Sequence, residues 1–150
     1  MIQIKHYLKN LYRTKQAEKS RRDFLRLDMN ESVSGLPKDF VKEVLNDVNP
    51  ELLAMYPEYE NFQKKLAAHN NLDPANICLS NGSDAAIKYI YDAYISSGDK
   101  VLLTDPTFAM YPVYCAMFNA QVVNVAYKQG LSFSTEDFLD KISKDIKLAV

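Results

Sequence analysis

The sequence predicts an α/β fold with three layers, in which a mostly parallel sheet lies between helices. The first observation is an alternation: from residue 74 onward, short apolar segments alternate with segments of helical spacing. The second is the composition of "KVLLTD" at 100–105 and "IKLAV" at 146–150, which are apolar along most of their length. Such strands are typical of a sheet that is covered on both faces. The intervening helices suit right-handed crossovers between parallel strands.

Residues 1–26 are predicted to form a basic, weakly amphipathic helical arm. Such an arm packs on another part of the protein or on a partner subunit. A basic helix on a membrane surface is the alternative, although the apolar face is short. The apolar residues that recur with helical spacing are Ile4, Tyr7, Leu8, Leu11 and Tyr12.

The next part of the chain is predicted to be a loop followed by two helices. Residues 27–37 are polar and contain turn-forming residues, which indicates a loop. A helix is expected at 38–46 and another from Glu58 to about Asn70. Between them, Pro57 restricts Tyr56 to an extended backbone.

The segment after Pro74 is predicted to run βαβαβαβ. Gly98 stands where a helix C-terminal glycine is expected, and Ser134 or Thr135 could cap the last helix. The expected strands are 76–80, 100–105, 120–127 and 146–150, and the expected helices lie within 84–98, 106–120 and 134–143.

Composition and charge exclude several classes of protein. The 150 residues suit one domain, and a net charge of −1 provides no general attraction for nucleic acid or an anionic membrane. No apolar run approaches the roughly 20 residues needed to span a bilayer. Cys78 and Cys115 are far apart, and the chain has no cluster of Cys and His residues. We therefore expect a cytoplasmic protein without a disulfide framework or a metal site.

The turn "SNGSDAAI" at 80–87 can be interpreted in two ways. Gly82 allows backbone to approach a ligand closely. Ser83 and Asp84 stand at the expected helix start, where free N–H groups and the helix dipole favour an anion. The alternative is simple capping of the helix by Ser83 or Asp84. The P-loop and dinucleotide glycine motifs are absent, which disfavours a nucleotide-binding domain.

Phe108 lies just beyond the expected strand 100–105. Ligands of open α/β sheets bind beyond the carboxyl ends of strands, so the ring could stack on a planar ligand. The alternative is packing in the core beneath the following helix.

Three stretches of the chain resemble the histidinol-phosphate aminotransferases, which are class I/II aminotransferases and pyridoxal-phosphate (PLP) enzymes of fold type I. The stretches are "LDMNES...GLP", "YPEYENFQKKLAAHNNLDPANICLSNGSDAAI" and "GDKVLLTDPTFAMYPVYCAMFNAQVV". The resemblance runs from about residue 25 to residue 150 and covers less than half of a typical member. It implies an arm and substrate-covering loop at 1–37, and an incomplete N-terminal portion of the PLP-binding large domain at 38–150.

The resemblance also implies roles for residues around the cofactor. Gly82, Ser83 and Asp84 match the turn whose amides hold the cofactor phosphate. Phe108 matches the aromatic residue that stacks on the pyridine ring, where many members have tyrosine. Tyr56 matches a tyrosine that reaches the cofactor phosphate of the neighbouring subunit in a homodimer; otherwise it is a rim aromatic held by Pro57.

Asn30 and Glu31 match a segment that folds over the active site near the substrate. The alternative for these two residues is a loop with local side-chain capping.

The resemblance places the catalytic residues outside residues 1–150. The family's "NPNNPTG" turn, the aspartate on the pyridine nitrogen, the Schiff-base lysine and the substrate-binding arginine should follow residue 150. We therefore expect an inactive fragment of a longer aminotransferase. The complete enzyme would transfer an amino group between a small phosphorylated or acidic amine and a 2-oxo acid. The default substrates of the family are histidinol phosphate and 2-oxoglutarate, and other members act on precursors of surface polysaccharides.

Two alternatives stay open. One is a PLP-dependent decarboxylase that acts on an amino-acid phosphate. The other is a non-catalytic remnant that binds phosphate or only a partner subunit.

Overall fold

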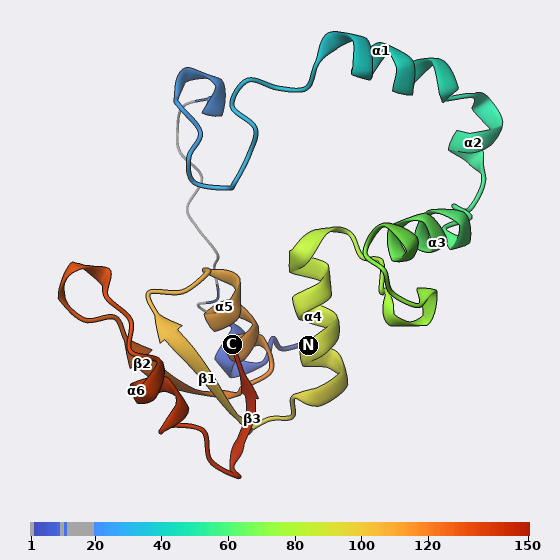
Figure 1. The fold of residues 1–150 in the computed structure, drawn as a ribbon. Coiled ribbons are helices and arrows are strands. Elements are labelled where there is room, and N and C mark those ends of the chain that lie inside the picture. The colour runs from blue at the N-terminus through green and yellow to red at the C-terminus, as the bar shows by residue number, and fades with distance from the viewer. Residues whose placement is uncertain (1, 10, 12–19) are drawn as a thin grey trace. The chain divides into compact units, whose positions relative to one another are not determined.

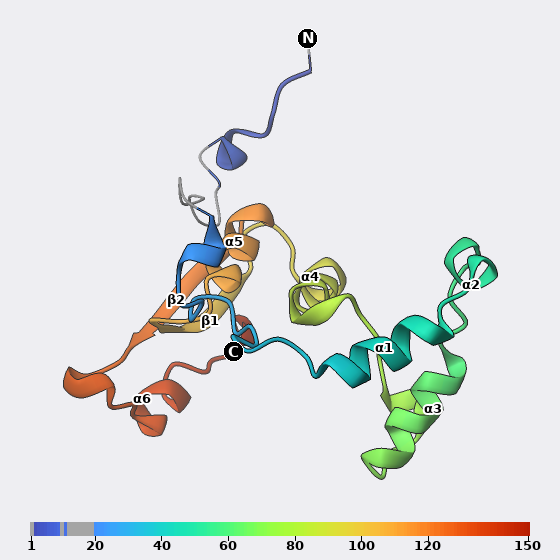
Figure 2. The same cartoon turned by 90° about the horizontal axis from the view of Figure 1, so that it is seen from above.

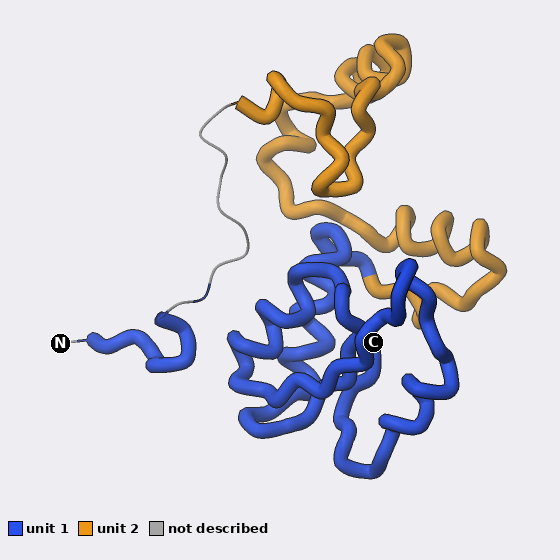
Figure 3. Tube along the Cα trace, turned by 90° about the vertical axis from the view of Figure 1, so that its left-hand side faces the viewer, with its two compact units in different colours: residues 1–15, 79–150 blue, residues 16–78 orange. Residues whose placement is uncertain are grey.

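The computed structural model describes residues 2–9, 11 and 20–150. The chain forms two compact units, which Figure 3 colours separately. Unit 1 consists of residues 1–15 and 79–150, and unit 2 consists of residues 16–78. The sheet lies in unit 1.

Unit 1 contains a three-stranded parallel sheet in the order β2-β1-β3 (Figure 1). The strands are β1 (Lys100–Asp105), β2 (Gln121–Ala126) and β3 (Ile146–Ala149). The central strand β1 is the apolar segment "KVLLTD", whose residues 101–103 are all buried. The prediction of parallel strands at these three places is confirmed.

Three helices of unit 1 follow the predicted alternation: α4 (Gly82–Tyr94), α5 (Met110–Met117) and α6 (Thr135–Leu139). Ser134 caps α6, since its side chain accepts a hydrogen bond from the N–H of Asp137 at 3.1 Å. The β1–β2 and β2–β3 connections cross the sheet in opposite directions. Right-handed crossovers therefore place α5 and α6 on opposite faces, as Figure 2 shows. This arrangement confirms the α/β, three-layer prediction.

The main core of unit 1 lies between the sheet and helices α4 and α5. Apolar side chains from β1 and from both helices meet there, and removing them from water supplies the main stabilisation of such a layer. The buried members of this cluster are Ile87, Tyr91, Ile95, Val101, Leu103, Met110, Tyr114 and Cys115.

The predicted strand at 76–80 is wrong. Residues 77–80 have no strand structure, and Pro74–Asn76 form a 3-10 helix. A strand needs a neighbouring strand for its backbone groups. Here a side chain, and not a neighbouring strand, binds the backbone of this segment: Nε2 of Gln63 donates to the carbonyl of Ile77 at 2.7 Å and to that of Pro74 at 3.1 Å.

Gly98 is not the C-terminal glycine of a helix. The helix α4 ends at Tyr94, and Gly98 lies in the turn before β1 with a φ of 91°. Its N–H donates to the carbonyl of Asn119 at 2.9 Å. The glycine is therefore used for a left-handed turn that joins two loops of unit 1.

Unit 2 contains the helices α1 (Lys38–Asp47), α2 (Pro50–Ala54) and α3 (Glu60–His69). The predictions of α1 and α3 are confirmed. The short helix α2 was not predicted, although Asn49 and Pro50 are typical of a helix start. The Asn49 side chain accepts a hydrogen bond from the N–H of Leu52 at 2.8 Å.

The predicted continuous helix over residues 1–26 is not formed in the part of the arm that the structure describes. Two short 3-10 helices stand there instead, at His6–Leu8 and Arg21–Asp23. Tyr12 lies outside the described residues. An isolated helix needs a buried apolar face to be stable in water, and Ile4 remains exposed. Residues 27–37 form a loop, as predicted.

Candidate functional site

Helix α4 begins in the turn at 80–84, where a hydrogen-bond acceptor from a ligand could approach the first N–H groups. Gly82 is the first helical residue, and its N–H donates to the carbonyl of Ser80 at 2.9 Å. The side chain of the N-cap residue, Asn81, makes no capping hydrogen bond. The first N–H groups of a helix have no partner within the helix, and the dipole makes this end positive. The arrangement therefore suits an anion.

Gly82 is required by its backbone conformation. Its φ is 76°, a left-handed value that L-residues adopt at a cost. A Cβ at this position would meet no heavy atom within 4 Å. The turn thus needs glycine for its backbone angles, while the space in front of it is open.

Ser83 and Asp84 are the second and third residues of α4. The interpretation of either as a simple N-cap is wrong, because the helix begins before both of them and Asn81 is the N-cap residue. Their backbone N–H groups belong to the first turn, where an anion would be bound.

Phe108 lies in the turn between β1 and α5 and is 44% exposed. Its ring packs edge-on against Tyr111, with the ring centres 6.0 Å apart and the planes at 85°. An edge contact leaves a face of the Phe108 ring available for stacking. The contact with Tyr111 of α5 agrees with the alternative of packing beneath the following helix, but Phe108 is not among the buried residues of the core cluster.

The structure brings Phe108 and the start of α4 to the same end of unit 1. A short turn joins the end of helix α4 to the start of β1, so the helix and the strand run in opposite directions. The start of α4 and the carboxyl end of β1 therefore lie at the same end of the sheet (Figure 1). A hydrogen bond fixes this end: the hydroxyl of Tyr114 donates to the carbonyl of Asp84 at 2.9 Å. Gly82, Ser83, Asp84 and Phe108 thus form one candidate site.

Tyr56, Asn30 and Glu31 belong to unit 2. Tyr56 lies between α2 and α3, immediately before Pro57, and is 96% exposed. Its ring and hydroxyl make no hydrogen bond or ring contact with the residues that the structure describes. The whole side chain is therefore available to a partner.

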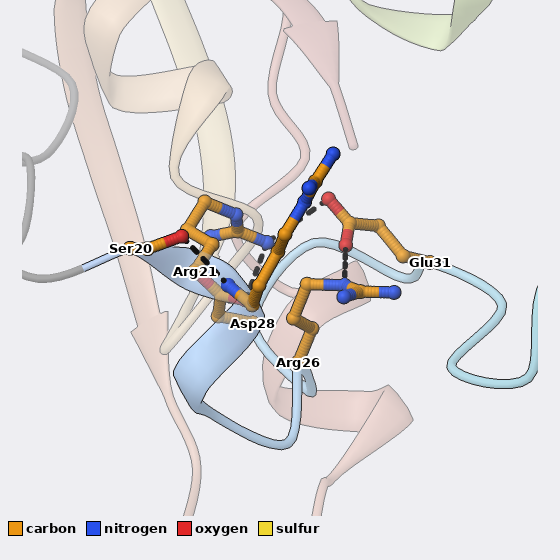
Figure 4. Close-up of polar contacts among 6 residues, drawn as sticks. Ser20, Arg21, Arg26, Asp28 and Glu31 are labelled. Atoms are coloured by element: carbon orange, nitrogen blue, oxygen red, sulfur yellow. Dashed lines mark hydrogen bonds and ion pairs between the residues drawn. The ribbon is translucent and has the colours of Figure 1, made fainter.

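Glu31 is held by two arginines (Figure 4). Oε1 of Glu31 accepts from Nη2 of Arg21 at 2.9 Å, and Oε2 lies 2.6 Å from Nε of Arg26. Arg21 also binds both carboxylate oxygens of Asp28, at 2.6 and 3.0 Å. Asn30, between the two acids, has a left-handed φ of 59°. The loop is thus closed by an ionic network around a turn.

The network changes the titration of its members. The hydrogen bond from Arg21 is the main cause that lowers the pKa of Asp28 below its usual value, with the charges of Arg21 and Arg26 acting in the same direction. A bidentate pairing of arginine with a carboxylate favours the ionised acid.

Sequence reasoning missed two groups that position the predicted residues. Tyr114 sits in an apolar helix, where an aromatic residue is normally interpreted as core. Arg21 and Arg26 were counted only as part of a basic arm. The Tyr114–Asp84 contact has no local sequence signal, because the two residues are 30 positions apart. The pairs of Arg21 and Arg26 with Asp28 and Glu31 lie within one short segment, but they form only once the loop takes its turn.

Within the described ranges of the chain, no helix is long and apolar enough to cross a membrane. In those same ranges, no group of three or more His, Cys, Asp or Glu side chains is arranged to hold a metal ion.

Comparison with known families gives a consistent result. A family model described as aminotransferase class I and II matches residues 22–150. A histidinol-phosphate aminotransferase of Ruminiclostridium cellulolyticum is 32% identical over 128 residues, which are 83% of this chain and 35% of that protein. The enzyme of the same name from Thermoanaerobacter sp. (strain X514) is 31% identical over 121 residues, 79% of this chain and 34% of that one. The chain spans about a third of the length of these relatives.

Solved structures show the same fold. The chain is similar to histidinol-phosphate aminotransferase from Sinorhizobium meliloti, solved in complex with pyridoxal-5'-phosphate, with a TM-score of 0.59 and 22% identity over 67% of this chain and 28% of that one. L-threonine-O-3-phosphate decarboxylase from Porphyromonas gingivalis gives a TM-score of 0.56 and 23% identity over 75% of this chain and 34% of that one. These likenesses confirm the predicted fold class, the first part of the fold type I large domain.

Proposed function

Because the chain belongs to the class I and II aminotransferase family, we propose that it is the N-terminal part of a PLP-dependent aminotransferase. The complete protein would transfer an amino group between a small phosphorylated or acidic amine and a 2-oxo acid. The names of the similar proteins support histidinol phosphate as the first substrate to test. The Schiff-base lysine would come from the remainder of the protein, so residues 1–150 by themselves are inactive.

The observation that carries this proposal is the glycine-led start of α4, where the side chain of the N-cap residue Asn81 makes no capping bond. Gly82, Ser83 and Asp84 would bind the phosphate of PLP at the positive end of the helix. The N–H groups of Ser83 and Asp84 would donate to it, and Gly82, whose own N–H donates to the carbonyl of Ser80, would let the phosphate approach the backbone closely. The absence of a capping bond from Asn81 and the open space in front of Gly82 support this fit. When bound, PLP supplies the electron sink that amino-group transfer requires.

Phe108 would lie against the pyridine ring of the cofactor. Its half-exposed ring at the carboxyl end of β1 supports this role. A phenyl ring provides stacking and excludes water from one face of the cofactor. It provides no hydroxyl, so any hydrogen bond made by a tyrosine at this position in relatives is missing here.

Tyr56 would reach the cofactor phosphate of the neighbouring subunit in a homodimer with shared active sites. The nearly complete exposure of its side chain supports a partner from outside the chain. The tyrosine hydroxyl can donate a hydrogen bond to a phosphate oxygen.

Asn30 and Glu31 would close over the substrate, as part of an arm and loop at residues 1–37 that precedes the large-domain portion at 38–150. The ionic network of Arg21, Arg26 and Asp28 supports this role, because it gives the loop a defined shape. The enzyme would act in the cytoplasm.

The first experiment is the intact mass of the protein expressed from its natural gene, before and after PLP and borohydride reduction. A mass at least double 17.1 kDa, with one reduced PLP adduct, is expected. A mass of 17.1 kDa without a specific adduct would refute the proposal in favour of a remnant that binds phosphate or only a partner subunit.

The second step is a transamination assay with histidinol phosphate and 2-oxoglutarate. Formation of glutamate supports the aminotransferase. Release of CO2 from an amino-acid phosphate, without glutamate, would show a decarboxylase instead.

A further inference from the structure

Tyr114 connects α5 to the first turn of α4. Its hydroxyl donates to the backbone carbonyl of Asp84 at 2.9 Å, and the two residues are 30 positions apart in the chain. Tyr114 is only 6% exposed and Asp84 is half-buried, so the bond is partly shielded from bulk water. A hydrogen bond that is shielded from water is electrostatically stronger than one on the surface.

The ring that carries this hydroxyl is fixed by its neighbours. Tyr114 packs on Tyr91 with ring centres 5.7 Å apart, and Tyr91 in turn packs on Phe118 at 5.8 Å. Tyr91 is fully buried, and both tyrosines belong to the core between the sheet and the two helices. Close packing of this kind leaves the Tyr114 side chain little rotamer freedom.

The bond acts at the start of α4. Asp84 is the third residue of the helix, and a carbonyl at this position already accepts a hydrogen bond from the fourth residue beyond it. The hydroxyl of Tyr114 is therefore a second donor to the carbonyl of Asp84, and helix α4 does not need it in order to form. What the second bond adds is a fixed position for the first turn relative to α5, which begins two residues after Phe108.

We propose that Tyr114 is a positioning residue for the cofactor: it holds the first turn of α4 so that the N–H groups of Ser83 and Asp84 converge on the phosphate of PLP. This inference rests on the proposed function. It adds a residue that touches neither the cofactor nor the substrate and acts only through the helix start.

The test is Tyr114→Phe in the full-length protein, with affinities measured for PLP and for pyridoxal, which lacks the phosphate. Phenylalanine keeps the ring and leaves no buried group without a partner, so the variant is expected to fold. The dissociation constant for PLP should rise about fivefold, roughly the effect of one hydrogen bond. The dissociation constant for pyridoxal should stay unchanged.

Tyr91→Phe is the matched control. Its hydroxyl lies in the same core but contacts Sγ of Cys115 at 3.3 Å and not the start of α4. This variant should bind PLP like the wild type. Hydrogen exchange provides a second measurement, in which the amides of residues 85–87, the first with bonds inside the helix, should exchange faster in Tyr114→Phe and not in Tyr91→Phe.

Equal losses of PLP and pyridoxal affinity, equal effects of the two variants, or no effect of Tyr114→Phe would each overturn the inference. A failure of the proposed function gives a different result, because the wild-type protein itself would then bind no PLP. That result would refute both the proposed function and the role of Tyr114.

Discussion

Replacing Gly82 by alanine should destabilise the protein and weaken PLP binding. The φ of Gly82 is 76°, and a left-handed conformation costs an L-residue about 1–2 kcal/mol. A new Cβ would meet no heavy atom within 4 Å, so the cost comes from the backbone and not from a clash. The free energy of unfolding of the apo-protein, measured with urea, should therefore fall by about 1–2 kcal/mol.

The effect on PLP follows from how the strain is relieved. Rotation of the backbone at Gly82 turns the first N–H groups of α4 away from a common point. A hydrogen bond to a charged group is worth about 1.5–3 kcal/mol, so the loss of one raises the dissociation constant for PLP about tenfold or more. Titration of the apo-protein with PLP, followed by absorbance, measures this change.

Gly98→Ala is the matched control for Gly82→Ala. Gly98 has a φ of 91°, a Cβ there would also meet no heavy atom within 4 Å, and it lies beyond the other end of α4. Its replacement should cost a similar free energy of unfolding and leave PLP affinity unchanged. If the two variants bind PLP equally well, or if Gly82→Ala is as stable as the wild type, the reasoning about the start of α4 is wrong.

Three further predictions concern single contacts. Phe108→Leu should weaken PLP binding by about 0.5–1.5 kcal/mol, the value of an aromatic contact, whereas Phe108→Tyr should keep it; equal affinities of both variants would contradict stacking. In Arg21→Gln, the pKa of Asp28, which Arg21 lowers in the wild type, should rise toward 3.8 in an NMR titration of the carboxyl group. The hydrogen bond from Lys100 lowers the pKa of Asp145 to about 2, so this pair stabilises the fold above pH 3.8 and the benefit is lost as the pH falls toward 2. Lys100→Met should therefore be less stable than the wild type at pH 6, with a smaller difference at pH 2, and a difference that is the same at both values would exclude the pairing.

The elements of unit 1 that could be predicted from the sequence are those with a local cause. The strand at 100–105 is an apolar run whose middle is completely buried, and α6 begins at a serine that caps it. Gly82 was singled out because a glycine lets the backbone approach a ligand closely, and it lies in the turn that the small polar residues before a helical run indicate. In each case the signal and the structure lie within the same few residues.

Two features were missed where the structure depends on distant residues. The segment 76–80 has the apolar composition of a strand, but the side chain of Gln63 occupies the carbonyl of Ile77. The contact of Tyr114 with Asp84 links two helices across a stretch that includes all of β1. No local pattern could reveal either contact, because both are formed only when the unit folds.

The order β2-β1-β3 has a practical consequence for handling the chain. Among the described residues, β2 and β3 each have a strand partner on one side only, so each presents a free row of backbone donors and acceptors. Such edges pair readily with strands of other molecules. A preparation of residues 1–150 alone is therefore expected to aggregate with rising concentration, and mutations on these two strands that add a charge should increase its solubility.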